Sequence, residues 1–177
     1  TDMINTELMG KAKAYAVKCH ADTNHKYNGM PYDFHLQMVV DYAKKYAYHL
    51  DDADILISIS AAWAHDVIED CRQTYNDVKT ALGKDVADVV YALTNEKGRN
   101  RKERANASYY SLIRITPLAT FVKLCDRLAN AKYSKDTGSS MLEAYKKEHE
   151  HFRNCLVDLK YRDMWEELEG ILDVREP

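Results

Sequence analysis

The chain has few of the residues that interrupt helices. Among 177 residues, six are glycine and three are proline, and the period-two alternation typical of strands is nearly absent. Long helices are therefore predicted throughout, and the expected fold class is all-α. No internal repeat, low-complexity tract or linker divides the sequence, so one domain over residues 1–177 is expected.

Further absences limit the classes of function. No apolar run is long enough to span a bilayer and no signal sequence opens the chain, so no membrane partner is expected. The four cysteines, at positions 19, 71, 125 and 155, form no Cys-x-x-Cys pair, which argues against a zinc knuckle or a disulfide framework and favours a cytoplasmic location. A net charge of −3 argues against non-specific nucleic-acid binding. The oligomeric state is left open.

Residues 55–70 form the most informative stretch. An almost wholly apolar run, too long for a strand, predicts a buried helix that ends in His65, Asp66, Glu69 and Asp70. On one continuous helix, His65 would lie over Glu69 and Asp66 over Asp70. Because buried charges are costly and imidazole and carboxylate groups bind divalent cations, the pattern favours a metal site. The alternative is the solvated end of a core helix.

A second polar stripe crosses the apolar segment 121–130. Lys123, Asp126, Arg127 and Asn130 stand at i, i+3, i+4 and i+7, so they share one face of a predicted helix. By periodicity alone, a solvated stripe with ion pairs inside it is favoured over a binding site.

The histidines carry weaker signals when each is taken alone. His35 opens a predicted helix, where a lone histidine is more often a hydrogen-bonded structural residue than a ligand. The same structural role is the default for His20 and His25. His149 and His151 have polar neighbours and are predicted at the surface.

Several helix boundaries have local signals. Thr74 followed by Asp77 resembles a capping box at the start of a short helix. Thr116-Pro117 is expected to open the next long helix as its N-cap and first residue. The charge-dense residues 94–104 are read either as a solvated connector or as a segment that contacts distal phosphates.

Four motifs follow one another along the chain. They are A-V-K-C-H at 16–20 with H-K-Y-N-G-M-P-Y-D-F-H-L at 25–36, A-A-W-A-H-D-V-I-E-D-C at 61–71, L-G-K-D-V-A-D-V-V-Y-A-L-T at 82–94, and K-L-C-D-R-L-A-N at 123–130. In order and spacing they resemble the HD-domain metal-dependent phosphohydrolases. Within these, they resemble the hydrolase domain of RelA/SpoT-type alarmone enzymes and the small stand-alone alarmone hydrolases. The resemblance runs from about residue 12 to residue 135.

The resemblance implies an all-α HD-domain bundle of about eight to ten helices with a metal centre. His35, His65, Asp66 and Asp126 match the family's H…HD…D ligand order. Two nitrogen and two carboxylate ligands without sulfur suit one divalent ion, which is usually Mn²⁺ in the family, with Fe²⁺ and Zn²⁺ as alternatives.

The same resemblance implies a reaction. Glu69 and Asp70 are expected to position or deprotonate an attacking water. Phosphoryl oxygens need positive charge around them, and the expected substrate contacts are Lys26, His25, Lys123, Arg127, Asn130, Arg101 and Arg104. The expected reaction releases pyrophosphate from the ribose 3′ position of (p)ppGpp. The alternatives are hydrolysis of another nucleotide or a phosphorylated cofactor, such as ppApp or NADPH, and a nucleotide-binding module without catalysis.

The chain departs from the family pattern at several positions. Leu36 stands where a proline is usual, the loop before His35 is one residue longer, and Cys71 replaces a threonine. His25 stands where an arginine helps to hold the guanine base. Discrimination of guanine from adenine is therefore expected to be weaker than in relatives with that arginine.

Overall fold

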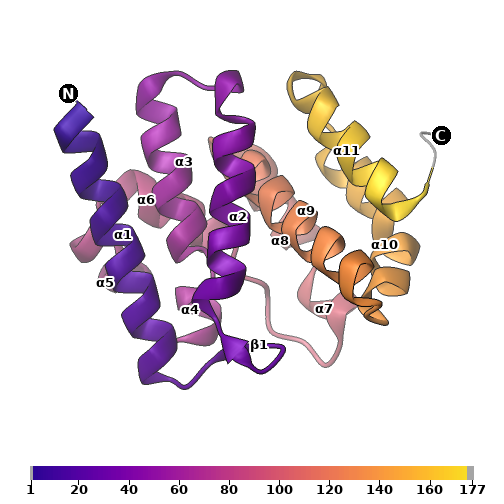
Figure 1. Ribbon diagram of the computed structural model, residues 1–177, viewed down its shortest axis with the longest axis horizontal. Coiled ribbons are helices and arrows are strands. Elements are labelled where there is room, and N and C mark those ends of the chain that lie inside the picture. Colours follow the sequence, from indigo (N-terminus) through magenta and orange to yellow (C-terminus); the bar gives the residue numbers. More distant parts are fainter. Residues whose placement is uncertain (1, 175–177) are drawn as a thin grey trace.

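The computed structural model describes residues 2–174, with side chains from residue 7 onward, and this part of the chain is almost entirely helical (Figure 1). The all-α prediction is confirmed. The α-helices are α1 (Asp2–Asp22), α2 (Asp33–Lys45), α3 (Asp52–Ala64), α4 (Val67–Asp70), α5 (Tyr75–Leu82), α6 (Lys84–Ala92), α7 (Arg101–Arg104), α8 (Ala107–Ile115), α9 (Ala119–Thr137), α10 (Met141–Leu156) and α11 (Arg162–Leu172). Two short 3₁₀ helices are η1 (Ala47–His49) and η2 (Leu159–Tyr161), and strands β1 (Lys26–Tyr27) and β2 (Met30–Pro31) pair as an antiparallel hairpin.

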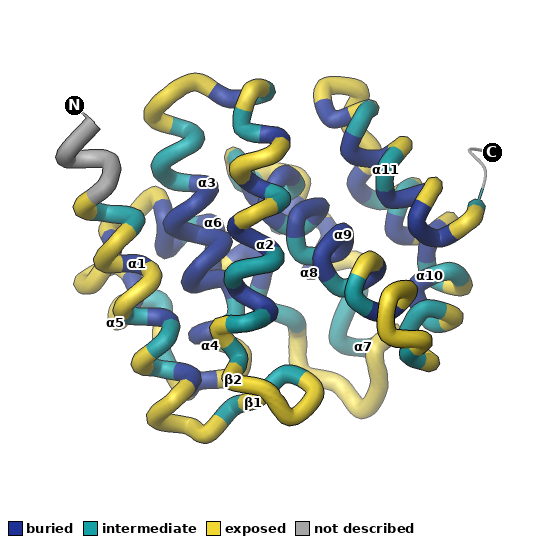
Figure 2. The backbone as a smooth tube through the Cα atoms, viewed as in Figure 1, coloured by how far each residue is buried: buried dark blue, intermediate teal, exposed yellow. Residues whose placement is uncertain are grey.

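Helix α3 lies at the centre of the bundle. It packs against α1, α2, α6 and α9, and α9 in turn contacts α2, α10 and α11 (Figure 1). Fully buried side chains on these helices include Leu36, Val39, Ala62, Leu124 and Leu128. The buried stretches of the chain gather in the interior, on α3, α2 and α9 (Figure 2). A helix that is apolar nearly all round is stable only when other helices surround it, which accounts for the central place of α3. Between residues 2 and 174, no helix has the length and apolar character needed to cross a membrane.

The apolar helix does not continue to Asp70. It ends at Ala64, and Asp66 has φ −104° and ψ 0°, after which α4 starts in a new direction. The prediction of one continuous helix, with His65 above Glu69, is therefore wrong. The His65 ring ends the helix locally, because its Nδ1 lies 2.8 Å from the carbonyl oxygen of Ala62 and satisfies a terminal acceptor.

The predicted start of α9 at Thr116-Pro117 is also wrong. Thr116 instead ends α8 and donates its hydroxyl proton to the carbonyl oxygen of Leu112 at 2.7 Å. The ring of Pro117 keeps Thr116 in extended backbone, with φ −92° and ψ 119°, which stops α8. Helix α9 begins at Ala119 after Leu118, whose φ of 70° is left-handed.

A buried polar group joins α10 to α11. His149, predicted at the surface, is buried, and its Nε2 lies 3.1 Å from Glu169 Oε1. Arg153 Nε lies 2.9 Å from the same oxygen. The surface prediction fails for His149 because its polar sequence neighbours say nothing about α11, which covers it. His151, two residues on, is exposed as predicted.

The capping box at the start of α5 is confirmed and gives a test of the fold. The Asp77 amide donates to Thr74 Oγ1 at 3.1 Å, and the Thr74 amide donates to Asp77 Oδ2 at 2.9 Å. We expect Thr74→Ala to lower the free energy of unfolding by about 1 kcal/mol, because an exposed N-cap bond is lost. The matched control is Thr80→Ala, an exposed position inside the same helix, with an expected change of about 0.5 kcal/mol or less. Urea unfolding in the presence of a chelator measures both free energies. Equal stabilities of the two variants would contradict this account.

Candidate metal centre

Two histidines and two aspartates from three helices meet at one point. His35 stands in the first turn of α2, His65 and Asp66 follow α3, and Asp126 lies in the middle of α9. Asp126 Oδ1 is 3.0 Å from His35 Nε2 and 3.2 Å from His65 Nε2, while Asp66 Oδ2 is 3.1 Å from His65 Nε2. The predicted ligand set is therefore assembled by the packing of α2, α3 and α9.

The hydrogen bonding of His65 indicates which ring nitrogen is free to bind a cation. Its Nδ1 faces the Ala62 carbonyl oxygen and so carries a proton, which leaves the Nε2 lone pair facing Asp66 and Asp126. A lone pair opposite two carboxylate oxygens is repulsive unless a positive charge lies between them. The ring is only 3% exposed. Burial opposes protonation, but Asp66 and Asp126 outweigh it and raise the pKa of His65 well above its usual value, so a proton on Nε2 supplies this positive charge when no cation is bound.

The carboxylates of the cluster are held by a second layer of hydrogen bonds. The Tyr32 hydroxyl donates to Asp66 Oδ2. Asn130 Nδ2 lies 3.2 Å from Asp126 Oδ1, and Lys123 Nζ lies 3.4 Å from Asp126 Oδ2. Such partners orient ligands around a metal ion. With two nitrogen and two carboxylate donors, the residues present fit a divalent cation.

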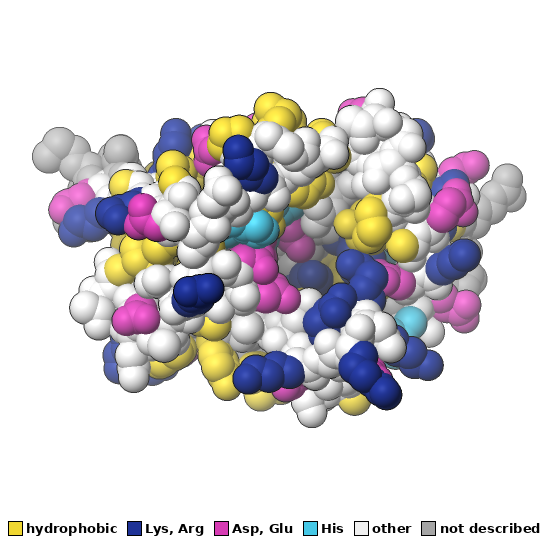
Figure 3. Space-filling model, turned by 90° about the horizontal axis from the view of Figure 1, so that it is seen from below, with side chains coloured by type: hydrophobic (Ala, Val, Ile, Leu, Met, Phe, Trp, Pro, Cys, Tyr) yellow, Lys and Arg dark blue, Asp and Glu magenta, His cyan; other side chains and the backbone are white. Residues whose placement is uncertain are grey.

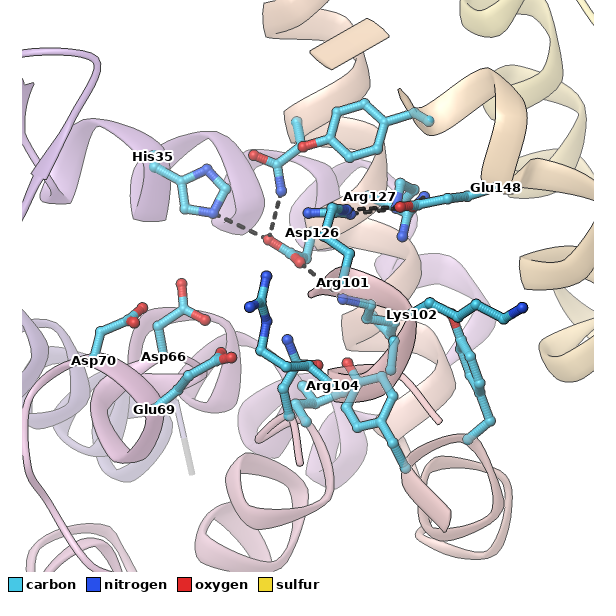
Figure 4. Close-up of a pocket in the computed structure, with 18 of the residues that line it drawn as sticks. His35, Asp66, Glu69, Asp70, Arg101, Lys102, Arg104, Asp126, Arg127 and Glu148 are labelled. Atoms are coloured by element: carbon cyan, nitrogen blue, oxygen red, sulfur yellow. Dashed lines mark hydrogen bonds and ion pairs between the residues drawn. The ribbon is translucent and has the colours of Figure 1, made fainter. Parts of the chain in front are cut away.

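Two further carboxylates stand beside the cluster. Glu69 and Asp70 come from α4, and each has a carboxylate oxygen within 4.8 Å of one from Asp66 (Figure 4). Partial burial, and then the Asp66 charge, raise the pKa of Glu69 and raise that of Asp70 to about 7. Crowded like charges of this kind are relieved by a cation, so these shifts agree with the fit of a divalent ion.

The cluster opens into a pocket of about 930 Å³, within the size range of small-molecule sites. Acidic side chains lie on one side of the hollow and basic side chains on the other (Figure 3). The basic side comes from two helices, and its members that line the pocket are Arg101, Lys102, Arg104, Lys123 and Arg127. This separation of charge suits a polyanionic ligand. One anionic group would contact the basic side chains, and the same or another anionic group would reach a cation held by the cluster.

Glu148 of α10 holds the basic side in place. Its two carboxylate oxygens lie 2.6 and 3.1 Å from Arg101 Nε and Nη2, and one of them lies 3.2 Å from Arg127 Nη1 (Figure 4). The buried Arg127 guanidinium also lies 4.2 Å from the ring centre of Phe152. The ion pairs expected inside the 121–130 stripe are thus replaced for Arg127 by a contact with α10. A bidentate arginine–carboxylate pair is geometrically specific, so Glu148 anchors α7 beside the pocket.

The predicted substrate contacts divide into two groups. Those that line the pocket are Lys123, Arg127, Asn130, Arg101 and Arg104. His25 and Lys26 are not among the described lining residues. His25 stacks on Tyr32 with ring centres 4.0 Å apart, and Lys26 is exposed on β1. Contact of these two residues with a substrate stays a prediction.

Other lining residues were not foreseen. Tyr32 stands three positions before His35, and this spacing on one helix face is a signal that could have identified it. The pocket is also lined by Tyr109, Tyr110, Tyr145, Glu148 and His151. Their sequence surroundings contain no pattern that points to a shared site, because α8 and α10 reach the pocket only through tertiary packing.

Comparison with known proteins gives consistent matches. A family model described as HD domain matches residues 12–152. The guanosine-3′,5′-bis(diphosphate) 3′-pyrophosphohydrolase MESH1 of Danio rerio is 26% identical over 129 residues, which are 72% of this chain and 69% of that protein. MESH1 of Drosophila melanogaster is 31% identical over 74 residues, 42% of this chain and 41% of that protein. The guanosine-3′,5′-bis(diphosphate) 3′-pyrophosphohydrolase of Aquifex aeolicus is 31% identical over 131 residues, 72% of this chain but 18% of that protein. The matched part thus spans less than half of the last two relatives.

The donor cluster leads to a metal-binding test. We expect Asp66→Ala to hold one divalent ion fewer per chain than wild type after dialysis, because one of two offsetting carboxylates is removed, while the helical circular dichroism stays near wild type. The control is Asp136→Ala, which removes an exposed carboxylate from α9 that pairs with Lys132, and it should keep the ion. Elemental analysis of the dialysed proteins measures the difference. Equal metal content in Asp66→Ala and wild type would show that the cluster is not the binding site.

Proposed function

The chain belongs to the HD domain family, and on this premise we propose that it is a metal-dependent phosphohydrolase that releases pyrophosphate from (p)ppGpp. The observation that carries the proposal is the cluster of His35, His65 and Asp126, with Asp66 3.1 Å from His65, at one end of a pocket whose opposite wall is basic. The names of the relatives supply the substrate class. The described cysteines are all free thiols, which agrees with the cytoplasmic location that we propose.

The metal centre of the proposal consists of His35, His65, Asp66 and Asp126. Mn²⁺ is the ion proposed, with Fe²⁺ and Zn²⁺ as the alternatives that the same ligands allow. When bound, the ion would lower the pKa of water and offset charge on a phosphoryl oxygen. The protein residues orient this chemistry, because Tyr32 and Asn130 hold the two carboxylates by hydrogen bonds.

Glu69 and Asp70 are the proposed catalytic residues. They line the pocket beside Asp66 and remain open to solvent, so a water molecule can reach both the carboxylates and the metal ligands. In the proposed reaction they position this water and accept its proton as it attacks the phosphorus atom bonded to the ribose 3′ oxygen. The bond from that phosphorus to the 3′ oxygen breaks, and the oxygen takes up a proton to become a hydroxyl. The released pyrophosphate then faces the basic wall, where positive charge stabilises its oxygens.

The basic wall is proposed to bind the phosphates of the nucleotide. Arg101 and Arg127 both donate to the Glu148 carboxylate, which offsets part of their positive charge and fixes their position. Lys102 and Arg104 on α7 line the same pocket, and they are the proposed contacts of the distal phosphates. Lys123 is the member of the basic wall that contacts Asp126, with Nζ 3.4 Å from Oδ2, and it is the proposed contact of the phosphoryl group that reacts.

A nucleotide panel assayed with Mn²⁺ separates this function from its alternatives. We expect pyrophosphate to be released from ppGpp, and we expect Glu69→Gln and Asp70→Asn to lower kcat by about 100-fold or more while retaining the metal, as general-base loss does. The control, Glu143→Gln, changes an exposed residue of α10 and should be as active as wild type. Metal-loaded protein that binds nucleotides but hydrolyses none of ppGpp, ppApp and NADPH would favour a non-catalytic binding module. Loss of metal from both acidic variants would show that their roles are misassigned.

The basic wall leads to a separate kinetic test. We expect the double variant Lys102→Gln/Arg104→Gln to raise KM by about 5- to 30-fold with little change in kcat, because two charge contacts, one exposed and one half-buried, are worth ~1–2 kcal/mol. The effect should shrink with added salt, since screening acts within ~10 Å at 0.1 M. The control is Arg99→Gln, an exposed residue of the same segment that pairs with Glu103. An unchanged KM at low salt would show that the segment is a solvated connector that does not contact the substrate.

A further inference from the structure

A second group of side chains of the kinds that bind metals packs against the Tyr32 ring, outside the proposed catalytic pocket. His20 Nδ1 is 2.9 Å from His25 Nδ1 and 3.2 Å from Cys71 Sγ, and the three donor atoms lie within 4.8 Å of one another. His20 is 1% exposed and Cys71 is 2% exposed, while His25 is half-buried. The convergence is therefore a property of the interior and not of mobile surface side chains.

The backbone around these residues brings them together. His20 stands in the last turn of α1, and after a left-handed Asn24 (φ 52°) the His25 amide donates to the His20 carbonyl oxygen at 2.9 Å. Cys71 ends α4, where its amide donates to the Val67 carbonyl oxygen, and α4 contacts α1. Both ends are held by backbone hydrogen bonds, so the backbone keeps the three donor atoms close together and only small side-chain shifts are needed to admit an ion.

Hydrogen bonds among the three groups cannot satisfy all of their donor and acceptor atoms at once. The Nδ1 of His20 faces two neighbours, but a ring nitrogen offers either one proton or one lone pair. Burial disfavours the charged ring, so His20 is neutral. A cation, in contrast, can accept a lone pair from each of His20, His25 and Cys71 at once.

We propose that His20, His25 and Cys71 form a second metal site that binds Zn²⁺. In a tetrahedral zinc site, bond lengths of about 2.05 Å to nitrogen and 2.3 Å to sulfur imply about 3.3 Å between two nitrogens and about 3.6 Å between nitrogen and sulfur. The two separations from His20 Nδ1, 2.9 and 3.2 Å, are each about 0.4 Å shorter than these values, and the His25 and Cys71 donor atoms lie within 4.8 Å of each other. Zinc binding displaces the Cys71 proton to solvent, and three protein ligands leave one position for water.

The surroundings of the site favour a thiolate-binding ion. The Thr23 hydroxyl, 3.8 Å from Cys71 Sγ, has closer acceptors in the carbonyl oxygens of Cys19 and His20, at 3.1 and 3.2 Å, so it leaves the sulfur available to a cation. Sulfur selects Zn²⁺ over Mn²⁺, whereas the centre at Asp66 and Asp126 contains no sulfur. Two of the three ligands, His25 and Cys71, are also positions at which the sequence departs from the motifs that it otherwise resembles.

The zinc site would hold Tyr32, which in turn hydrogen-bonds to the metal centre at Asp66. The Tyr32 ring stacks on His20 and His25, with ring centres 4.3 and 4.0 Å apart, and its hydroxyl donates to Asp66. The ion would also tie the end of α1 to the end of α4, the helix that carries Glu69 and Asp70. The role is therefore structural, a cross-link that holds neighbouring parts of the proposed catalytic pocket in position (Figure 1).

Cobalt loading tests the site without relying on turnover. After chelation and reloading with Co²⁺, we expect an ultraviolet thiolate-to-cobalt charge-transfer band in wild type and in Asp66→Ala, whose remaining site contains the cysteine. Cys71→Ser should lose the band and one bound ion per chain. Cys155→Ser is the matched control and should keep the band. Cys155 Sγ lies 3.6 Å from His151 Nε2, but among the described residues no third possible ligand joins this pair.

A second variant guards against misfolding of Cys71→Ser. His25→Gln changes a half-buried side chain, and we expect it to lower Co²⁺ affinity by about tenfold or more with the helical circular dichroism unchanged. In Asp66→Ala, Zn²⁺ at about 100 times Kd should raise Tm by about 5–10 °C, and adding Cys71→Ser should abolish the shift. Absence of the band from cobalt-loaded wild type, or its persistence in Cys71→Ser, would overturn the site. Neither outcome bears on the proposed phosphohydrolase activity.

Discussion

Two nearly buried carboxylates, those of Asp66 and Asp126, are the constraint on which the rest of the structure depends. Both face the Nε2 atom of His65, and buried charge is tolerated only when it is paired and hydrogen-bonded. Tyr32 and Asn130 supply the hydrogen bonds, and a divalent ion would supply the remaining charge. The apolar packing of α2, α3 and α9 must therefore bring these polar positions to the same depth.

The break after Ala64 divides a short stretch of sequence between two tasks. His65 and Asp66 turn toward α2 and α9, where they complete the ligand cluster, while Glu69 and Asp70 on α4 face the pocket. A continuous helix would have placed all four groups in two adjacent rows. Because the helix is interrupted between the pairs, the proposed metal ligands and the proposed proton acceptors are adjacent but distinct.

Glu148 determines how the positive charge of the pocket is distributed. By pairing with Arg101 and Arg127, it fixes α7 against α9 and α10 and removes part of the charge of these arginines. Lys102 and Arg104 remain on the pocket wall. The resulting field, negative near the metal ligands and positive opposite, would orient an incoming polyanion before any close contact forms.

The sequence by itself determined the helical class and the capping box at Thr74, and it picked out the four residues proposed as metal ligands, since periodicity, caps and motif order are local properties. Only the tertiary structure decided the turn at His65, the burial of His149 beneath α11 and the pairing of Glu148 with arginines on two other helices. The meeting of Cys71 with two histidines was equally invisible. Each of these depends on which distant segment packs against a residue, and the energy of such packing is not recorded in a residue's own sequence neighbours.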